Sequence, residues 1–327
     1  MPFHKAAVDN ITHTLVGVTL ANGFYRQRVG KAAVPILAIA SNLPDLDALV
    51  VLSGDPRSVL LRRTFGHSLL LLPIWVLLLT WIFRRFFPQL PFRTILGLTA
   101  LGAGLHLLFD LVNSFGVVLL WPISQWRPEL ATIFIIDLTL TALLALPLLL
   151  CLPKSRRRSL PGLSRISILA VAGYLLFCGG NRWLAERALA GEAASLSPVP
   201  GFSYVFPEPL GPLRWRGVIR QGDIYHLSLI HSLTGKLEAR GDVATSVGDP
   251  AVQAVLATEP GQRLERFFKA PVWEVAQHNP GARVTASDLR FRSLVLNRDP
   301  VFVFAFQVTP AGEVREELHP SDFVRGR

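Results

Sequence analysis

Long apolar runs, separated by short basic segments, fill the first 190 residues of this 327-residue chain. Several of them approach the roughly 20 residues that a helix needs to cross about 30 Å of hydrocarbon. Lipid offers no partners to backbone polar groups, so runs of this kind fold as helices. The sequence therefore predicts an all-α polytopic membrane domain over residues 1–190. The expected helices, about six, lie at 11–25, 32–53, 67–83, 94–113, 130–151 and 166–184.

The tail of the chain has a different composition. Residues 191–327 hold 15 basic and 15 acidic residues, whereas the first 190 hold 18 and 8. A stretch rich in Ser, Pro and Gly at 191–200 is typical of a linker. We expect residues 201–327 to form a small soluble α+β accessory domain with antiparallel strands, because apolar and polar residues alternate in several runs. Those runs are 215–221, 224–230, 283–292 and 301–309, with a helix at 250–269 that breaks near Pro260.

All of the net charge of +10 lies in the apolar part of the chain. Its Lys and Arg residues sit between the apolar runs, which predicts membrane topology and argues against a nucleic-acid partner. The loops after the first, third and fifth helices carry 11 of them, and the opposite loops carry 5. Because positive loops stay in the cytoplasm, we expect an integral protein of the inner membrane with a non-cytoplasmic C-terminal domain. The lipid bilayer is its expected partner, and the sequence identifies no protein partner.

Ionisable side chains inside membrane helices are rare and costly, so each is a functional hypothesis. Counting 1.5 Å per helical residue places seven of them, from five predicted helices, in the outer third of the membrane. They are His13, Asp45, Asp47, His67, His106, Asp110 and Asp137.

The spacing of these residues favours a metal site. His106 and Asp110 are four residues apart, on one helical face, and Asp45 and Asp47 follow Pro44, where a broken helix can direct both toward one centre. Imidazole and carboxylate without thiolate suit a divalent transition metal such as Zn, Mn or Fe, as one or two ions. The alternative is packed His residues and simple His–Asp hydrogen bonds. Four buried carboxylates without a cation would be very unfavourable, so we favour a site.

Other polar residues carry weaker signals. Arg62 and Arg63 precede His67 and could bind a substrate phosphate through their guanidinium groups, or equally could contact lipid headgroups. Cys151 and Cys178 lie in apolar stretches and are expected to be packing residues. The His residues of the tail lack metal-ligand spacing and are expected to be ordinary surface or strand residues. They are His226, His231, His278 and His319.

Five short motifs occur in one order along the chain. They are Asp9-Asn10-Ile11-Thr12-His13, Asn42-Leu43-Pro44-Asp45-Leu46-Asp47, Gly66-His67-Ser68, His106-Leu107-Leu108-Phe109-Asp110 and Phe134-Ile135-Ile136-Asp137. Together they resemble a family of LexA-binding, inner-membrane-associated hydrolases, also described as membrane-bound metal-dependent hydrolases. The resemblance covers residues 9 to about 150 and implies a metal site. It also implies that the natural chain begins at Val8.

These observations predict a membrane-bound metal-dependent hydrolase that acts on an ester or phosphoester, of a lipid or a lipid-linked substrate. The expected ligands are His13, Asp45, Asp47, His67, His106 and Asp110. Asp137 and Asp47 are the candidate catalytic residues, with Asp137 as general base or as a further ligand. An ion or proton-coupled transporter that uses the same cluster is the alternative, since broken helices also mark transport sites. A structural or assembly module acting through the tail is a third possibility.

Overall fold

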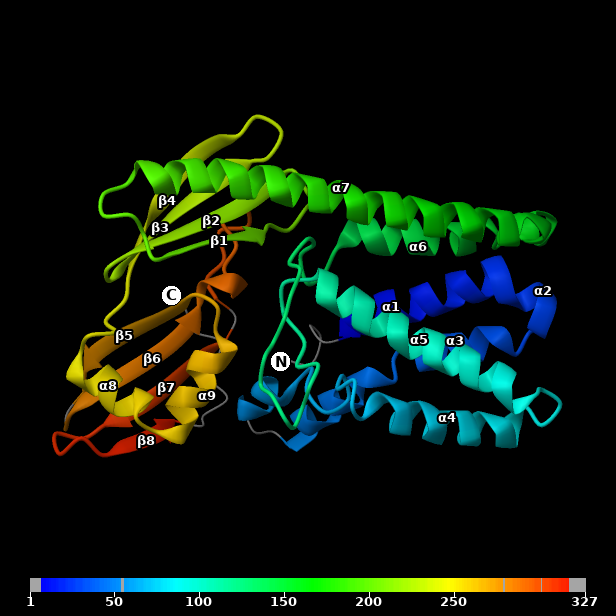
Figure 1. Ribbon diagram of the computed structural model, residues 1–327, viewed down its shortest axis with the longest axis horizontal. Helices are drawn as coiled ribbons and strands as arrows, with labels where there is room; N and C mark the ends of the chain where they lie inside the picture. The colour runs from blue at the N-terminus through cyan, green and yellow to red at the C-terminus, as the bar shows by residue number, and fades with distance from the viewer. Residues whose placement is uncertain (1–6, 54–55, 279, 301, 318–327) are drawn as a thin grey trace. The chain divides into compact units, whose positions relative to one another are not determined.

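The computed structural model describes residues 7–53, 56–278, 280–300 and 302–317, and these form two compact units (Figure 1). The first lies within Met1–Val50 and Leu61–Gly179, and the second within Val51–Leu60 and Gly180–Arg327. His319 lies outside the described residues. Each unit has its own buried apolar core.

The first part of the chain is helical. Helix α1 (Ala7–Leu20) continues through a π-helical turn (Ala21–Tyr25) into α2 (Arg26–Val29). After α3 (Ala33–Ala40) come two 3-10 helices, Pro44–Ser53 and Pro56–Leu61. The remaining helices are α4 (Leu72–Phe86), α5 (Phe92–Val112), α6 (Leu138–Leu150), a 3-10 turn at Lys154–Ser159 and α7 (Leu160–Ser195).

Fewer of these helices can cross a membrane than the sequence predicted. Within the described residues, Phe92–Val112 and Lys154–Ser195 are long and apolar enough. A third span is added if Ala33–Ala40 and Pro44–Val50, which are bent by 50°, count as one. The prediction of about six spans is therefore not supported. Helices α4 and α6 have 15 and 13 residues, so each is only about 20 Å long, against about 30 Å of hydrocarbon.

Local signals explain why two of the predicted helices are shorter than expected. Pro73 lies in the first turn of α4, which begins at Leu72 and not at residue 67. The Asp137 carboxylate accepts a hydrogen bond from the Leu140 amide and caps α6, which begins at Leu138 and not at residue 130. The residues before the cap are extended, and the Thr132 amide donates to the Val112 carbonyl at the end of α5.

Helix α3 packs against α1 on one side and α5 on the other, and α4 packs against α5 (Figure 1). Gly102 makes the contact between α3 and α5 possible. A Cβ atom at Gly102 would lie 2.7 Å from the Ala40 Cβ and 3.0 Å from the Ser41 nitrogen. Because Gly102 has no side chain, the C-terminal end of α3 can lie directly against the middle of α5.

The second unit contains two four-stranded antiparallel sheets, which confirms the antiparallel tail predicted from the sequence. The first sheet has β1 (Phe202–Pro207), β2 (Arg214–Gln221), β3 (Ile224–His231) and β4 (Lys236–Ala244), in that order. The second has β5 (Pro271–Gln277), β6 (Ala282–Asp288), β7 (Val303–Val308) and β8 (Val314–Glu317). Along the chain, α8 (Pro250–Leu256) and α9 (Glu259–Phe267) come between the two sheets. The two helices are separated at Thr258, the N-cap of α9.

The C-terminal part of α7 belongs to the core of the first sheet. Ala185 and Leu189 of α7 pack in one buried cluster with Val205, Trp215 and Ile230 of β1, β2 and β3. Helix α7 therefore extends well beyond the predicted end at residue 184. Its last turn occupies residues 191–195, the first half of the predicted linker.

A buried ion pair connects β2 to the segment that follows the second sheet's β6. Arg216 donates to the Glu208 carboxylate at 2.7 Å, and neither side chain is exposed. The same carboxylate accepts hydrogen bonds from the Ser293 hydroxyl and the Leu294 amide. Because the buried Glu208 carboxylate is paired and hydrogen-bonded in this way, the network fixes the 290–295 segment against the first sheet.

Candidate metal centre

Four side chains from three segments of the first unit form a buried cluster. Asp45 lies in the first turn of the 3-10 helix that follows the bend after α3, and His67 lies in the turn before α4. His106 and Asp110 lie one turn apart on α5. One ligand atom from each of the four lies within 4.8 Å of the others, and all four residues are buried. The cluster could therefore hold a metal ion.

The distances between the ligand atoms of His67, His106 and Asp110 are close to those around one small ion, and those to Asp45 are longer. His67 Nε2 lies 3.1 Å from His106 Nε2 and 2.9 Å from Asp110 Oδ2, and His106 Nε2 lies 3.4 Å from that oxygen. Asp45 Oδ1 lies 3.9 Å from His67 Nε2 and 3.8 Å from His106 Nε2. Zinc bonds of 2.0–2.1 Å would place tetrahedral donor atoms about 3.3 Å apart. The observed separations lie on both sides of that value.

Hydrogen bonds on the far side of each imidazole fix which nitrogen faces the cluster. His106 Nδ1 lies 2.7 Å from the Ser41 carbonyl oxygen, which can only accept, so Nδ1 donates. His67 Nδ1 lies 2.9 Å from Asp47 Oδ2 and donates to that carboxylate. In the neutral rings both Nε2 atoms then carry lone pairs, and these point at each other and at Asp110. Lone pairs and carboxylate oxygens in one buried place repel unless a proton or a metal cation lies between them.

Asp47 therefore lies beside the cluster and not within it. Its Oδ2 accepts from His67 Nδ1 and also from the Thr64 amide at 2.9 Å. Gly66 lets the turn that carries His67 approach the Pro44–Asp47 segment closely, because a Cβ atom at position 66 would lie 2.0 Å from the Pro44 carbonyl oxygen. A carboxylate that holds the outer nitrogen of a metal-binding imidazole is common in metalloproteins.

Asp110 is also held by Arg63 and His13. Arg63 Nη2 lies 2.8 Å from Asp110 Oδ1, and its Nη1 donates to the Asn113 side chain at 2.7 Å. Arg63 has a φ of 56°, a left-handed conformation that is uncommon for residues other than glycine. His13 Nε2 lies 3.2 Å from the same Oδ1, and the His13 ring stacks on that of His106 with centroids 3.8 Å apart.

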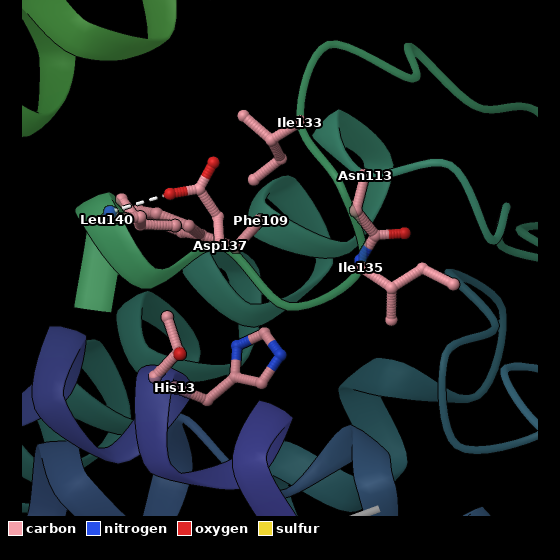
Figure 2. Close-up of a pocket in the computed structure, with 8 residues that line it drawn as sticks. His13, Phe109, Asn113, Ile133, Ile135, Asp137 and Leu140 are labelled. Carbon is pink, nitrogen blue, oxygen red and sulfur yellow. Dashed lines mark hydrogen bonds between the residues drawn. The ribbon is translucent and has the colours of Figure 1, made fainter. Parts of the chain in front are cut away.

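Asp137 lies outside this cluster, across a small pocket from His13. Figure 2 shows both side chains at the pocket, together with Asn113, Ile133 and Ile135. Asp137 Oδ1 caps α6, and Oδ2 accepts from the Tyr174 hydroxyl at 2.8 Å. The pocket offers about 10 Å³ to the centre of a water molecule, which is enough for about one.

The structure thus brings together most of the predicted site residues. Asp45, His67, His106 and Asp110 form the cluster, Asp47 and His13 contact it, and Asp137 does not. Arg62 is half-buried and its carbonyl accepts from Arg127. Sequence reasoning missed the Ser41 carbonyl and the Thr64 amide, and for Arg63 it considered a substrate phosphate or lipid headgroups but not Asp110. The excess of buried acids over bases was the signal that an arginine could pair with one of them.

Comparison with known proteins places the chain among membrane proteins. A family model for YdjM inner membrane proteins matches residues 8–183, more than half of the chain. The uncharacterised protein YfhP of Bacillus subtilis (strain 168) is 28% identical over 125 residues. That match covers 36% of this chain and 38% of YfhP, so the chain spans well under half of this relative. No solved structure is significantly similar.

Proposed function

This chain belongs to the YdjM inner membrane protein family, and on that premise we propose that it is a membrane-bound metal-dependent hydrolase. Its substrate is an ester or phosphoester, carried by a lipid or a lipid-linked molecule. The observation that carries the proposal is the orientation of His67 and His106. Both rings use Nδ1 as a donor to the protein and turn Nε2 toward two carboxylates.

The charge of the network supports one divalent ion. Asp45, Asp47 and Asp110 contribute three negative charges, Arg63 contributes one positive charge, and the neutral imidazoles contribute none. The sum is −2 for the side chains that the structure describes in this network. A single Zn, Mn or Fe(II) ion would therefore neutralise a centre that is otherwise very costly to bury.

The four cluster residues would hold the ion, and the neighbouring residues would orient them. Asp47 and the Ser41 carbonyl fix the two imidazoles, and Arg63 limits the negative charge on Asp110. A bound divalent ion polarises a scissile carbonyl or phosphoryl group and lowers the pKa of water. His13 and Asp137 border the pocket next to the cluster. In this proposal Asp137 would accept the proton of the attacking water and return it to the leaving oxygen as the ester or phosphoester bond breaks.

The membrane supplies the reason for a lipid substrate. The centre lies among apolar helices of an inner membrane family, where a water-soluble substrate would gain little. Arg62 remains our candidate for contact with a phosphate group of that substrate.

Metal analysis tests the proposal. Full-length protein purified in detergent without chelator should contain one transition metal ion per chain, and His106→Ala with Asp110→Ala should remove it. The matched control is His226→Ala with Asp242→Ala, which removes an exposed His–Asp pair that lies 2.8 Å apart in the second unit. Ester and phosphoester lipids should be hydrolysed only by protein that holds metal. Wild-type protein without stoichiometric metal would refute the site, and metal-loaded protein inactive on both lipid classes would refute the reaction.

The bend between α3 and the following 3-10 helix supports an alternative, an ion or proton-coupled transporter. Broken helices in transporters often hold the coupling ion, and here Asp45 follows a 50° bend. Ion flux into proteoliposomes, lost in Asp45→Asn, would support transport and argue against hydrolysis.

We also propose that the C-terminal domain lies outside the cytoplasm. Four cations precede α7, namely Lys154, Arg156, Arg157 and Arg158, and positive segments stay inside. A periplasmic reporter fused after Arg327 should be active and one fused after Arg157 inactive. The reverse pair of signals would invert this orientation.

A further inference from the structure

One end of the first sheet carries exposed leucines. Because the four strands follow one another in antiparallel order, the β1–β2 loop and the β3–β4 turn lie at the same end. Leu210 and Leu213 of the loop are 72% and 43% exposed, and Leu233 of the turn is 65% exposed. We call these three residues the leucine end. The opposite end, at the β2–β3 turn, carries Gly222 and Asp223.

The leucine end is attached to a defined point on α7. The Ser232 hydroxyl donates to the Asn181 side chain at 2.7 Å, and both residues are buried. The Ser232 amide donates to the Leu213 carbonyl at 3.1 Å. These bonds join the loop, the turn and the helix in one place, so the level of Asn181 along α7 is also the level of the leucine end.

That level coincides with the end of the apolar run of α7. Helix α7 is one of the two candidate spans, and it is uncharged from Ile166 to Asn181, a length of about 24 Å. Arg182 and Trp183 follow, and the Arg187 guanidinium lies 4.8 Å from the Trp183 ring centre. Trp183 is 54% exposed. Tryptophan with arginine at the end of an apolar run is typical of the membrane–water interface.

We propose that the leucine end is a membrane-docking surface, which inserts its three side chains into the lipid interface beside the place where α7 leaves the bilayer. Continuity with α7 identifies the partner as lipid, since the same bonds that hold the loop and turn together hold them at the end of a membrane span. Three exposed leucines in water would be an unfavourable apolar patch, whereas in the interface they are buried. This docking does not depend on the metal centre or its reaction.

A single fluorescent label tests the contact. Cys151 and Cys178 are buried, so a cysteine added by Leu233→Cys in the full chain provides the labelling site, and unmodified protein shows the background. The protein is reconstituted in phosphatidylcholine vesicles containing phosphatidylglycerol, and an NBD group is attached. Its emission should shift to the blue, resist quenching by aqueous iodide and be quenched by nitroxide-labelled lipid. Leu210→Cys should behave in the same way, which guards against a local effect of one substitution.

Asp223→Cys, at the other end of the same sheet, is the matched control. Its label should be quenched by iodide and not by the lipid nitroxide. The proposal is overturned if the label at position 233 responds as the one at 223 does. It is also overturned if the label at 233 is protected from both quenchers and the variant forms a disulfide-linked dimer, which would identify a second copy of the chain as the occupant.

Discussion

Asp45 and Asp47 are two residues apart, but they face different atoms of the same imidazole. Asp45 faces Nε2 of His67, and Asp47 accepts from Nδ1 at 2.9 Å. We expect Asp47→Asn to weaken metal binding by about 10–100-fold, because the ring loses the acceptor that orients it. Asp45→Asn, which removes a charged ligand, should weaken it more.

Competition against a chromophoric chelator measures these affinities. Asp242→Asn is the control, because Asp242 holds an exposed imidazole, that of His226, at a similar distance. Equal affinity in wild type and Asp47→Asn would contradict the orienting role.

Arg63 offers a second prediction for a single residue. It is 2% exposed and pairs with the fully buried Asp110. Removing one partner of a buried ion pair costs about 3–5 kcal/mol, because the other charge is left uncompensated. A metal ion at the cluster would compensate Asp110 in its place. Arg63→Gln should therefore lower the melting temperature strongly in metal-free protein and much less in metal-loaded protein. A loss of the same size in both would show that Arg63 acts through packing alone.

Residue types and spacing predicted much of this chemistry, but not its arrangement. His106 and Asp110 meet because they are one helical turn apart, which is visible in the sequence. The orientation of His67 depends on Asp47, 20 positions earlier, and the partner of Arg63 lies 47 positions later. No periodicity encodes such pairings, since they arise only when separate elements pack. For that reason the expected partners of Arg63 were a phosphate or lipid headgroups, and Asp47 was placed among the ligands.

Among the elements, the contact between α3 and α5 controls the position of His106. Gly102 lies one turn before His106, and the Ser41 carbonyl that holds the ring is at the end of α3. We expect Gly102→Ala to push α3 away from α5 and to lower metal affinity about tenfold, by disturbing that acceptor. Gly104→Ala on the same helix is the control, because a Cβ there meets nothing within 4 Å. Metal titration of both variants compares them, and equal affinities would contradict this view.

Helix positions were predicted better than helix lengths. Each apolar run contains a helix, but α4 and α6 begin only at Leu72, next to Pro73, and after Asp137. The apolar residues before these starts lie outside the helices that were predicted to include them. Helix α7 shows the opposite error. Its polar continuation after residue 184 suggested that the span had ended there, whereas Ala185 and Leu189 are buried against the sheet. Hydropathy detects lipid contact and cannot distinguish the end of a membrane span from the end of a helix.

For the whole molecule, this packing decides where the chain can be divided. A segment beginning at Pro200 would uncover Trp215, Ile230 and Val205, which α7 covers. Each such buried side chain contributes roughly 1.5–3 kcal/mol, so their sum is comparable to the about 5–15 kcal/mol of a typical domain. We expect a segment from Gly180 to fold and one from Pro200 to aggregate. Circular dichroism and size-exclusion chromatography of the two would compare them, and a monomeric, folded Pro200 segment would contradict the assignment.

The shared core of α7 and the first sheet also has a consequence for biosynthesis. Ala185 and Leu189 are made before any of the four strands that they cover, and they belong to a helix that is a candidate membrane span. The strands are therefore translated onto a partner that is already anchored at the bilayer. Domains generally fold as units in the order of synthesis. We therefore expect this sheet to fold during translation, against the end of α7 that is already in place.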